Sequence, residues 1–362
     1  MDAGKYYALL RFEEAALALR AALQLGVVDM IGERVVTPGE LGELFGFTEQ
    51  ATRTFVALLD VMEVLHREGN SIRVAERARE CLSVGAASSR QPYLAMGTGP
   101  EVEQFIRLLQ GDLPQDSMPL YAGDDAGETI MDQPDAASEI AFGLASRARN
   151  FAEPLARALA PYAGKARILA DLGAGSPFVA MASLNAIPHL AKAMLVDRAN
   201  GMQFAGMMAK EHGFDDPRLE FLEQDFFQSV PAADIYCVSN TAHDWLPHEY
   251  SDLMRHVRDS IAPGGVVCIH EPLLMSTWNS AEQWVNALWM ACYALTLFRL
   301  TEGKGTCYTR EEHDAVMDQN GFVPVGEPVP TADGCTALFY QLRTDAPRGS
   351  EGPMLAPMPG TR

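Results

Sequence analysis

The first ninety residues have a helical pattern of hydrophobic and polar positions. Apolar residues recur at steps of three and four along residues 11–30, which predicts an amphipathic helix that closes near Gly26. Another helix is expected after Thr37, because threonine caps helices and Pro38 suits a first helical turn. Residues 46–48 divide the stretch 41–65 into two helices, and residues 66–74 form two short extended pieces. Three helices followed by a small hairpin are typical of a winged-helix domain, which we place at residues 1–90.

The pattern changes after residue 165. Short apolar runs now alternate with helical stretches, and these runs are residues 167–172, 191–197, 219–225, 234–240, 264–271 and 336–343. Strands that alternate with helices predict an α/β fold with a mostly parallel, doubly wound sheet over residues 166–343. Residues 91–165 are expected to form a helical linker with a polar, acidic insertion at 111–138. Residues 344–362 are rich in proline and glycine, so we expect a flexible tail there.

The charge of the chain argues against DNA binding, which is the usual function of a winged helix. The sequence has 48 acidic and 28 basic residues, a formal net charge of −20, which repels phosphate backbones and anionic lipid surfaces. The helix expected at residues 49–65, which would enter the major groove of DNA, has Arg53 as its only basic residue. We therefore expect no nucleic-acid partner and assign the N-terminal domain to dimerisation or to covering a substrate.

Membrane segments, secretion and metal binding also find no support in the sequence. It has no run of about 18 apolar residues. The N-terminus lacks the basic start, apolar middle and cleavage site of a signal peptide. The six cysteines are far apart and include no CxxC pair, so zinc binding is not expected and reduced thiols indicate a reducing compartment. We predict a cytoplasmic protein with no membrane contact and no bound metal.

A glycine-rich turn marks a candidate cofactor site. The first apolar run leads into Gly173 and Gly175, and glycines between a strand and a helix let a ligand approach the backbone. Asp197 ends the next run, where an acid can bind the two hydroxyls of an adenosine ribose. NAD fits poorly, because Phe178 replaces the third glycine of GxGxxG and Pro177 has no N–H for a pyrophosphate. S-adenosylmethionine carries no phosphate and is affected less by these differences.

Five short motifs follow in the second half of the chain. They are Asp225-Phe226-Phe227, residues 231–236 (PAADIY), His243-Asp244-Trp245, Pro263-Gly264-Gly265 and His270-Glu271-Pro272. In residues, spacing and order of parts, the sequence resembles the class I S-adenosylmethionine-dependent small-molecule O-methyltransferases of the caffeic acid O-methyltransferase type and their bacterial relatives. The resemblance covers about residues 10–342. It implies a winged-helix dimerisation domain, a Rossmann-like methyltransferase domain, a homodimer formed by the N-terminal domain, and a small aromatic or polyketide-like acceptor.

The resemblance also implies roles for individual residues. His243 would be the general base that takes a proton from the acceptor hydroxyl, Glu271 would orient its imidazole, and Asp244 would complete the catalytic group. Histidine suits this role because it accepts a proton near pH 7. The residues expected to bind S-adenosylmethionine, or its product S-adenosylhomocysteine, are Asp171, Gly173, Gly175, Asp197, Asp225 and Phe226. Trp289 and Met290 are expected at the acceptor site, whereas Trp245 is assigned to packing.

The sequence departs from the family pattern at three places. A second glutamate usually follows in a GGxERT-like segment, but residues 302–309 read EGKGTCYT and have no acid at the matching position. Ser239 replaces a lysine that commonly stands four residues before the histidine of the HDW motif. The glycine turn ends in Ser176-Pro177 rather than Thr-Gly. These differences affect positions expected to bind the cofactor or to support the base.

Two other interpretations remain open at this point. One is carbon methylation next to a ketone, with His243 and Asp244 as metal ligands and Arg299 pairing with a substrate carboxylate. The other is a relative without catalytic activity that has become a binding or regulatory module. A test of cofactor binding separates the second interpretation from an enzyme.

Overall fold

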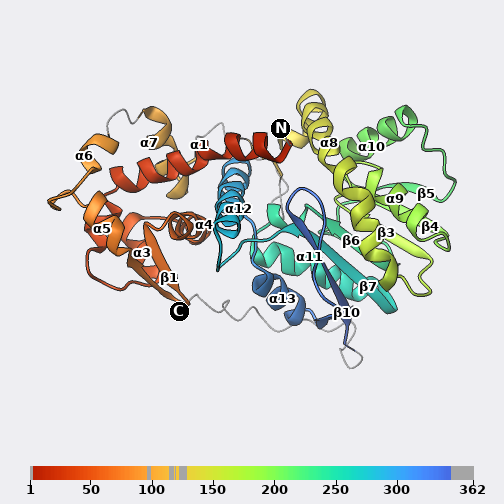
Figure 1. Ribbon diagram of the computed structural model, residues 1–362. Coiled ribbons are helices and arrows are strands. Elements are labelled where there is room, and N and C mark those ends of the chain that lie inside the picture. The colour runs from red at the N-terminus through yellow and green to blue at the C-terminus, as the bar shows by residue number, and fades with distance from the viewer. Residues whose placement is uncertain (1–2, 96–98, 114–117, 119, 122–128, 344–362) are drawn as a thin grey trace. The chain divides into compact units, whose positions relative to one another are not determined.

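The computed structural model describes residues 3–95, 99–113, 118, 120–121 and 129–343, and the chain divides into two units (Figure 1). Of these residues, the first unit holds those up to 113 and 274–307, and the second holds those from 118 to 273 and from 308 to 343. The sequence-based division differs at two places. The predicted linker at residues 91–165 is divided between the two units, and residues 274–307, predicted to belong to the methyltransferase domain, lie in the first unit. The predicted tail at 344–362 and most of the first half of the predicted insertion lie outside the described residues.

The first unit consists of helices and one small hairpin. Its helices are α1 (Ala3–Gln24), α2 (Val27–Ile31), α3 (Pro38–Phe45), α4 (Glu49–Val61), α5 (Glu76–Leu82), α6 (Gln91–Leu94), α7 (Pro100–Leu109) and α12 (Ala281–Leu300). Strands β1 (Leu65–Glu68) and β2 (Ser71–Val74) form the antiparallel hairpin. Thr37 caps α3, with its side chain accepting the Glu40 N–H, and Thr48 caps α4. Helices α3 and α4 and the hairpin therefore lie close to the predicted positions, whereas the helix predicted at residues 11–30 begins earlier, at Ala3, and is divided into α1 and α2.

Helix α12 joins the first unit because it is apolar on nearly every side. Phe55 and Leu58 of α4 are fully buried in the same core as Leu295 and Phe298 of α12. The indole N–H of Trp284 on α12 donates to the Val61 carbonyl at 2.9 Å. A helix without a polar face must be covered all round, and here helices α1 and α4 pack against it.

The second unit is built around a mixed sheet. Its helices are η1 (Ile130–Asp132), α8 (Pro134–Leu159), η2 (Ala160–Tyr162), α9 (Phe178–Ala186), α10 (Ala199–Glu211), η3 (Ala242–Asp244), α11 (Pro247–Ser260) and α13 (Arg310–Gln319). Its strands are β3 (Ile168–Leu172), β4 (Lys192–Asp197), β5 (Leu219–Glu223), β6 (Ala233–Ser239), β7 (Ile261–Pro272), β8 (Phe322–Pro324), β9 (Val329–Pro330) and β10 (Cys335–Leu342). The strand order is β5-β4-β3-β6-β7-β10-β8, with β9 beside β10.

The sheet has the topology of a doubly wound Rossmann-like fold. Strands β3 to β7 are parallel, and β10 returns antiparallel to β7. The chain moves outward from β3 through β4 to β5 and then crosses back to β6, so the order reverses beside β3. Helices α8, α9 and α10 pack on one face, and α11 and α13 cover the other (Figure 1). Ligands bind at the carboxyl ends of strands beside such a reversal.

Helices long and apolar enough to cross a bilayer are absent from the described residues. The predicted cytoplasmic location stays a prediction.

Candidate active site

Most of the residues predicted for the site lie at the carboxyl edge of the sheet in the second unit. β3 leads into the turn of Gly173 and Gly175, β4 ends at Asp197, and β6 leads through a short turn into His243 on η3. Glu271 stands near the end of β7, which is the parallel neighbour of β6. Because parallel neighbours end at the same edge, residues far apart in the sequence are brought together here.

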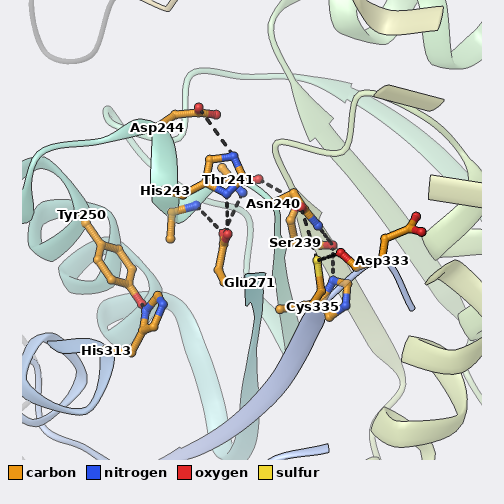
Figure 2. Close-up of polar contacts among 12 residues, drawn as sticks. Ser239, Asn240, Thr241, His243, Asp244, Tyr250, Glu271, His313, Asp333 and Cys335 are labelled. Atoms are coloured by element: carbon orange, nitrogen blue, oxygen red, sulfur yellow. Dashed lines mark hydrogen bonds and ion pairs between the residues drawn. The ribbon is translucent and has the colours of Figure 1, made fainter. Parts of the chain in front are cut away.

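The imidazole of His243 is held by the carboxylate of Glu271 (Figure 2). Nδ1 of His243 lies 2.5 Å from Oε2 of Glu271. The other oxygen, Oε1, accepts the backbone N–H groups of Thr241 and Ala242, each at 2.8 Å. Burial opposes ionisation of Glu271, but the neighbouring His243 and the Thr241 N–H hold its pKa below the usual range. An ionised carboxylate only accepts hydrogen bonds, so Nδ1 carries a proton and the lone pair of a neutral His243 is on Nε2.

Asp244 lies on the Nε2 side of the same imidazole. Its Oδ1 is 3.6 Å from Nε2, and both side chains are buried. Burial and the charge of Glu271 raise the pKa of Asp244 to about 7, although His243 opposes the rise. Burial alone would lower the pKa of His243, but the two carboxylates outweigh it and the pKa is raised. The site therefore stabilises a proton on His243, which is the state of a base that has just accepted one.

Aromatic hydroxyls support the segment that carries this base. The hydroxyl of Tyr308 donates to the Trp245 carbonyl at 2.6 Å, directly after the HDW aspartate. Tyr250 and His313 form a second buried contact, with the Tyr250 oxygen 3.2 Å from His313 Nδ1. His313 also helps to lower the pKa of Glu271. The sequence analysis did not predict a role for these residues. The only available signal was for Tyr308, which lies in the segment 302–309 that lacks the family's second glutamate.

The glycine turn beside β3 requires glycine and leaves open space. Gly173 has φ +70°, and a Cβ there would lie 2.7 Å from the Thr241 hydroxyl. Gly175 has φ +54°, and a Cβ there would meet nothing within 4 Å. Its N–H donates to Asp197 Oδ2 at 2.9 Å, and the Arg198 N–H donates to Oδ1 at 2.7 Å. Each carboxylate oxygen of Asp197 thus keeps a lone pair for a ligand hydroxyl.

Asp171, inside β3, is a buried acid beside this turn. Its Oδ2 has no hydrogen-bond partner among the described residues. Burial and the charge of Asp197 raise the pKa of Asp171 to about 8. A buried, incompletely bonded carboxyl group favours a cationic or hydrogen-bonding ligand nearby. The open turn, Asp197 and Asp171 together fit an adenosine cofactor with a positively charged tail.

Asp225 and Phe226 follow β5 at the same edge. Asp225 is exposed, and its Oδ1 accepts the Phe227 N–H at 2.9 Å within its own turn. Phe226 is buried, with its ring 5.9 Å from that of Trp245 in an edge-to-face arrangement. The ring of Phe227 lies 4.8 Å from that of Trp245, which agrees with the packing role expected for this tryptophan. The Trp245 indole N–H, however, is buried without a partner among the described residues.

The remaining candidates lie in the first unit. Trp289 and Met290 are on α12, and Met290 is buried. Their role at the acceptor site stays a prediction. Arg299 is engaged within the same unit, where its Nη1 lies 3.0 and 2.9 Å from the two carboxylate oxygens of Glu14. An arginine already paired in this way is a poor candidate for a substrate carboxylate. Within the described residues, no group of three or more His, Cys, Asp or Glu could hold a metal ion.

Comparison with known proteins agrees with this geometry. The family model for an O-methyltransferase domain matches residues 102–323, more than half of the chain. The chain belongs to this O-methyltransferase family. The fold is therefore that of the class I methyltransferases, and S-adenosylmethionine is the methyl donor of the family.

Two curated O-methyltransferases and one solved structure illustrate the similarity. Bovine acetylserotonin O-methyltransferase is 30% identical over 158 residues, 43% of this chain and 42% of the relative. The first curated relatives are thus matched over about two fifths of their length. Mitomycin biosynthesis 6-O-methyltransferase of Streptomyces lavendulae is 24% identical over 72% of this chain and 74% of the relative. An O-methyltransferase family 2 protein from Planctomyces limnophilus, solved in complex with apigenin, superposes with a TM-score of 0.79 at 25% identity, covering 94% of this chain and 96% of that one.

Proposed function

We propose that this protein transfers the methyl group of S-adenosylmethionine to a hydroxyl of a small metabolite, with His243 as the general base. The observation that carries the proposal is the contact between His243 and Glu271. The carboxylate accepts Nδ1–H at 2.5 Å and is itself fixed by two backbone N–H groups. Nε2 is then the basic atom, and its direction is set by a buried acid that cannot rotate without breaking these bonds.

The residues around His243 assist removal of the hydroxyl proton and then stabilise the imidazolium that results. The acceptor hydroxyl gives its proton to Nε2 as its oxygen attacks, and the imidazolium that forms lies between the carboxylates of Glu271 and Asp244. The sulfonium of S-adenosylmethionine supplies a methyl group that is already activated toward attack. Alignment of the attacking oxygen and removal of its proton are therefore what the protein contributes.

The cofactor-binding roles of the glycine turn are part of the same proposal. Gly175 leaves room for a ligand above the turn, and Asp197 has lone pairs for the ribose hydroxyls. Asp171 presents an unsatisfied carboxyl oxygen at the same edge. Phe226 supplies an apolar surface for the adenine, whereas Asp225 is mainly engaged in its own turn.

We further propose an aromatic or polyketide-like acceptor and a homodimer. A relative with a similar structure was solved with apigenin, which supports an aromatic hydroxyl as the acceptor group. Two exposed apolar side chains on α1, Leu10 and Phe12, support an interface on the N-terminal unit. Sedimentation of the purified protein tests the dimer, and a monomer at micromolar concentration would contradict it.

Calorimetric titration with S-adenosylhomocysteine tests the cofactor assignment. Wild type should bind with a Kd in the micromolar range or tighter, about −8 kcal/mol or more favourable. Asp197→Ala should bind at least about tenfold more weakly, since it loses hydrogen bonds to the ligand. Asp216→Ala is the matched control, because Asp216 pairs with Arg218 before β5, at the opposite edge of the sheet. No binding by wild type would favour a non-catalytic relative.

Product analysis separates oxygen from carbon methylation. Phenolic and ketone-containing acceptors are incubated with the protein and S-adenosylmethionine, and the site of the new methyl group is determined by NMR. Methylation of oxygen that persists in the presence of a chelator supports the proposal. Methylation of carbon, or loss of activity on metal removal, would support the alternative chemistry instead.

A further inference from the structure

The short helix that carries the proposed base is weakly held by its own backbone. Helix η3 has three residues. The Asp244 N–H reaches the Thr241 carbonyl at 3.3 Å, and the Trp245 N–H reaches the carbonyl of Ala242 at 3.4 Å. These distances are longer than the usual range for an N–H donor and a carbonyl. The position of His243 in η3 therefore depends on contacts at the two ends of the helix.

The two ends of η3 are held by different side chains. Glu271 accepts the N–H groups at the first end, as described above. At the other end, the Tyr308 hydroxyl donates to the Trp245 carbonyl at 2.6 Å. Trp245 follows the last residue of η3, and the final carbonyls of a helix have no partner inside it. Removal of the Tyr308 hydroxyl therefore takes the donor away from a buried carbonyl.

The backbone of Tyr308 is fixed to the chain that carries Glu271. Tyr308 forms a parallel β-bridge with Leu273, just beyond Glu271 and the end of β7. The next residue, Thr309, caps α13, and its side chain accepts the Glu312 N–H at 3.2 Å. Both ends of η3 are thus anchored at the end of β7, one through Glu271 and the other through Tyr308.

The ring of Tyr308 is fully buried between aromatic neighbours. Its centroid lies 5.8 Å from that of Tyr250 and 5.5 Å from that of His313. Tyr250 belongs to α11, the helix that follows η3, and His313 belongs to α13. Figure 2 shows Tyr250 and His313 next to each other, to the left of Glu271. A ring packed in this way holds its hydroxyl at a defined point.

We propose that Tyr308 is a positioning residue for methyl transfer, which holds η3 so that Nε2 of His243 faces the hydroxyl of the substrate. This assignment rests on the proposed function. Tyr308 lies in the segment 302–309, which has no acid to support the histidine, and it acts on the backbone of the base segment instead of on the imidazole. Proton removal requires hydrogen-bond distance between Nε2 and the hydroxyl, so a small displacement of η3 lowers the rate.

Tyr308→Phe tests the assignment, because it removes the hydroxyl and keeps the ring. The kcat should fall about 10- to 100-fold, as expected when a reacting group is displaced by up to about 1 Å. The KM for the acceptor and the Kd for S-adenosylhomocysteine should change by less than about threefold, because the hydroxyl contacts the base segment and not the glycine turn. A residue with a merely structural role would not affect kcat alone.

The Nδ1 proton of His243 gives a second measurement that needs no acceptor. In wild type its ¹H NMR signal should lie at low field, because the proton is shared with Glu271 over a short distance. In Tyr308→Phe the signal should move to higher field and exchange faster with water, because η3 is then anchored at one end only.

Tyr340→Phe is the matched control. Tyr340, on β10, is also buried, but its hydroxyl donates to Oδ1 of Asp314 at 2.8 Å and not to the base segment. Each variant loses one hydrogen bond of a buried tyrosine, so the two should lower Tm to a similar extent. Tyr340→Phe should keep the kcat and the Nδ1 signal of wild type.

A replacement that restores the donor completes the test. 4-Aminophenylalanine at position 308 keeps the ring and an N–H donor, and it should keep kcat within about threefold of wild type. This variant also decides the question if Tyr308→Phe does not fold. A fall in kcat of about tenfold or more, with the donor present, would overturn the role of the hydrogen bond.

Failure of this inference is distinct from failure of the proposed function. Methyl transfer by wild type and equally by Tyr308→Phe would overturn the role of Tyr308 and leave the proposed function intact. An equal loss of kcat in Tyr308→Phe and Tyr340→Phe would also overturn it, as would a matching loss of S-adenosylhomocysteine binding, because either result indicates a structural role. Wild type that transfers no methyl group to any hydroxyl would overturn both.

Discussion

Replacing Glu271 with glutamine changes the hydrogen bonds of the base while keeping the shape of the side chain. The carboxylate accepts three bonds, from the Thr241 N–H, the Ala242 N–H and the Nδ1–H of His243. A glutamine has one acceptor oxygen and one NH₂ donor, so it cannot accept from both sides. With its oxygen toward the backbone, its NH₂ faces Nδ1. The imidazole proton then moves to Nε2, the atom that must take the proton from the hydroxyl of the substrate.

The size of the effect follows from the alternative orientation of the amide. To keep the proton on Nδ1, the glutamine must turn its oxygen toward His243 and its NH₂ toward the N–H groups of Thr241 and Ala242. Two buried N–H groups then lose their acceptor, at roughly 1–3 kcal/mol each. The productive tautomer therefore becomes about 2–6 kcal/mol less favourable. At about 1.4 kcal/mol per tenfold change in rate, kcat/KM should fall about 30-fold to about 10⁴-fold.

Long-range ¹H–¹⁵N NMR of the histidine rings measures the tautomer without an acceptor. Above the pKa of His243, wild type should carry its proton on Nδ1 and the Glu271→Gln variant on Nε2. The His243→Gln spectrum assigns the signals. S-adenosylhomocysteine affinity should be unchanged within about threefold, since Glu271 lies outside the proposed cofactor contacts. A variant that keeps the Nδ1 proton, or keeps kcat/KM within threefold of wild type, would refute the role given to Glu271.

Three further predictions concern pH and backbone geometry. Methyl transfer should increase with pH through the pKa of His243, which neighbouring carboxylates hold above 6.5 against the effect of burial; a pH profile of kcat/KM measures this. Gly173→Ala should lower the free energy of unfolding by about 1–3 kcal/mol in urea titrations, because an L residue is strained at φ +70° and its Cβ meets the Thr241 hydroxyl. The free energy of unfolding should fall as pH rises from about 4 to about 8, because buried Asp171, whose pKa is about 8, keeps a proton that the unfolded chain loses. Asp171→Asn should remove up to about 1.4 kcal/mol per pH unit of this slope.

Each of these has its own control and contrary result. If kcat/KM rose with a midpoint at or below about pH 6, the pKa of His243 would not be raised by the neighbouring carboxylates, and the prediction would be wrong. Gly143→Ala, on α8 where a Cβ meets nothing within 4 Å, should be neutral or stabilising by about 0.5–1 kcal/mol. If Gly143→Ala lowered the free energy of unfolding as much as Gly173→Ala does, the loss at Gly173 could not be explained by its positive φ and its contact with Thr241. Equal slopes for wild type and Asp171→Asn would show that Asp171 is ionised in the folded protein.

Much of the site could be predicted because its residues follow consecutive strands of a parallel sheet. His243 and Glu271 are 28 residues apart, yet β6 and β7 are parallel neighbours and both lead to the same edge. The same rule brings Gly175 to Asp197 across β3 and β4. Short motifs at strand ends therefore located these side chains without knowledge of the packing.

Other features depend on packing that spacing does not encode. Arg147 reaches Asn240 from a helix 93 residues earlier in the chain. Asp225 follows a strand like the other acids, but its carboxylate is exposed and bonded to its own turn. The pattern of α12 predicts a buried helix without saying which partners bury it, and its packing with the N-terminal helices was missed. Tertiary contacts decide such cases.

Transfer of a labelled methyl group tests the central claim most directly. Wild type and His243→Ala are incubated with trideuteromethyl S-adenosylmethionine and a panel of phenolic acceptors, and products are analysed by mass spectrometry and NMR. The account predicts a labelled methyl group on an oxygen of the acceptor in wild type. It also predicts a rate at least about 100-fold lower in His243→Ala, with S-adenosylhomocysteine binding retained. Full activity in His243→Ala would contradict it, as would a label found on carbon.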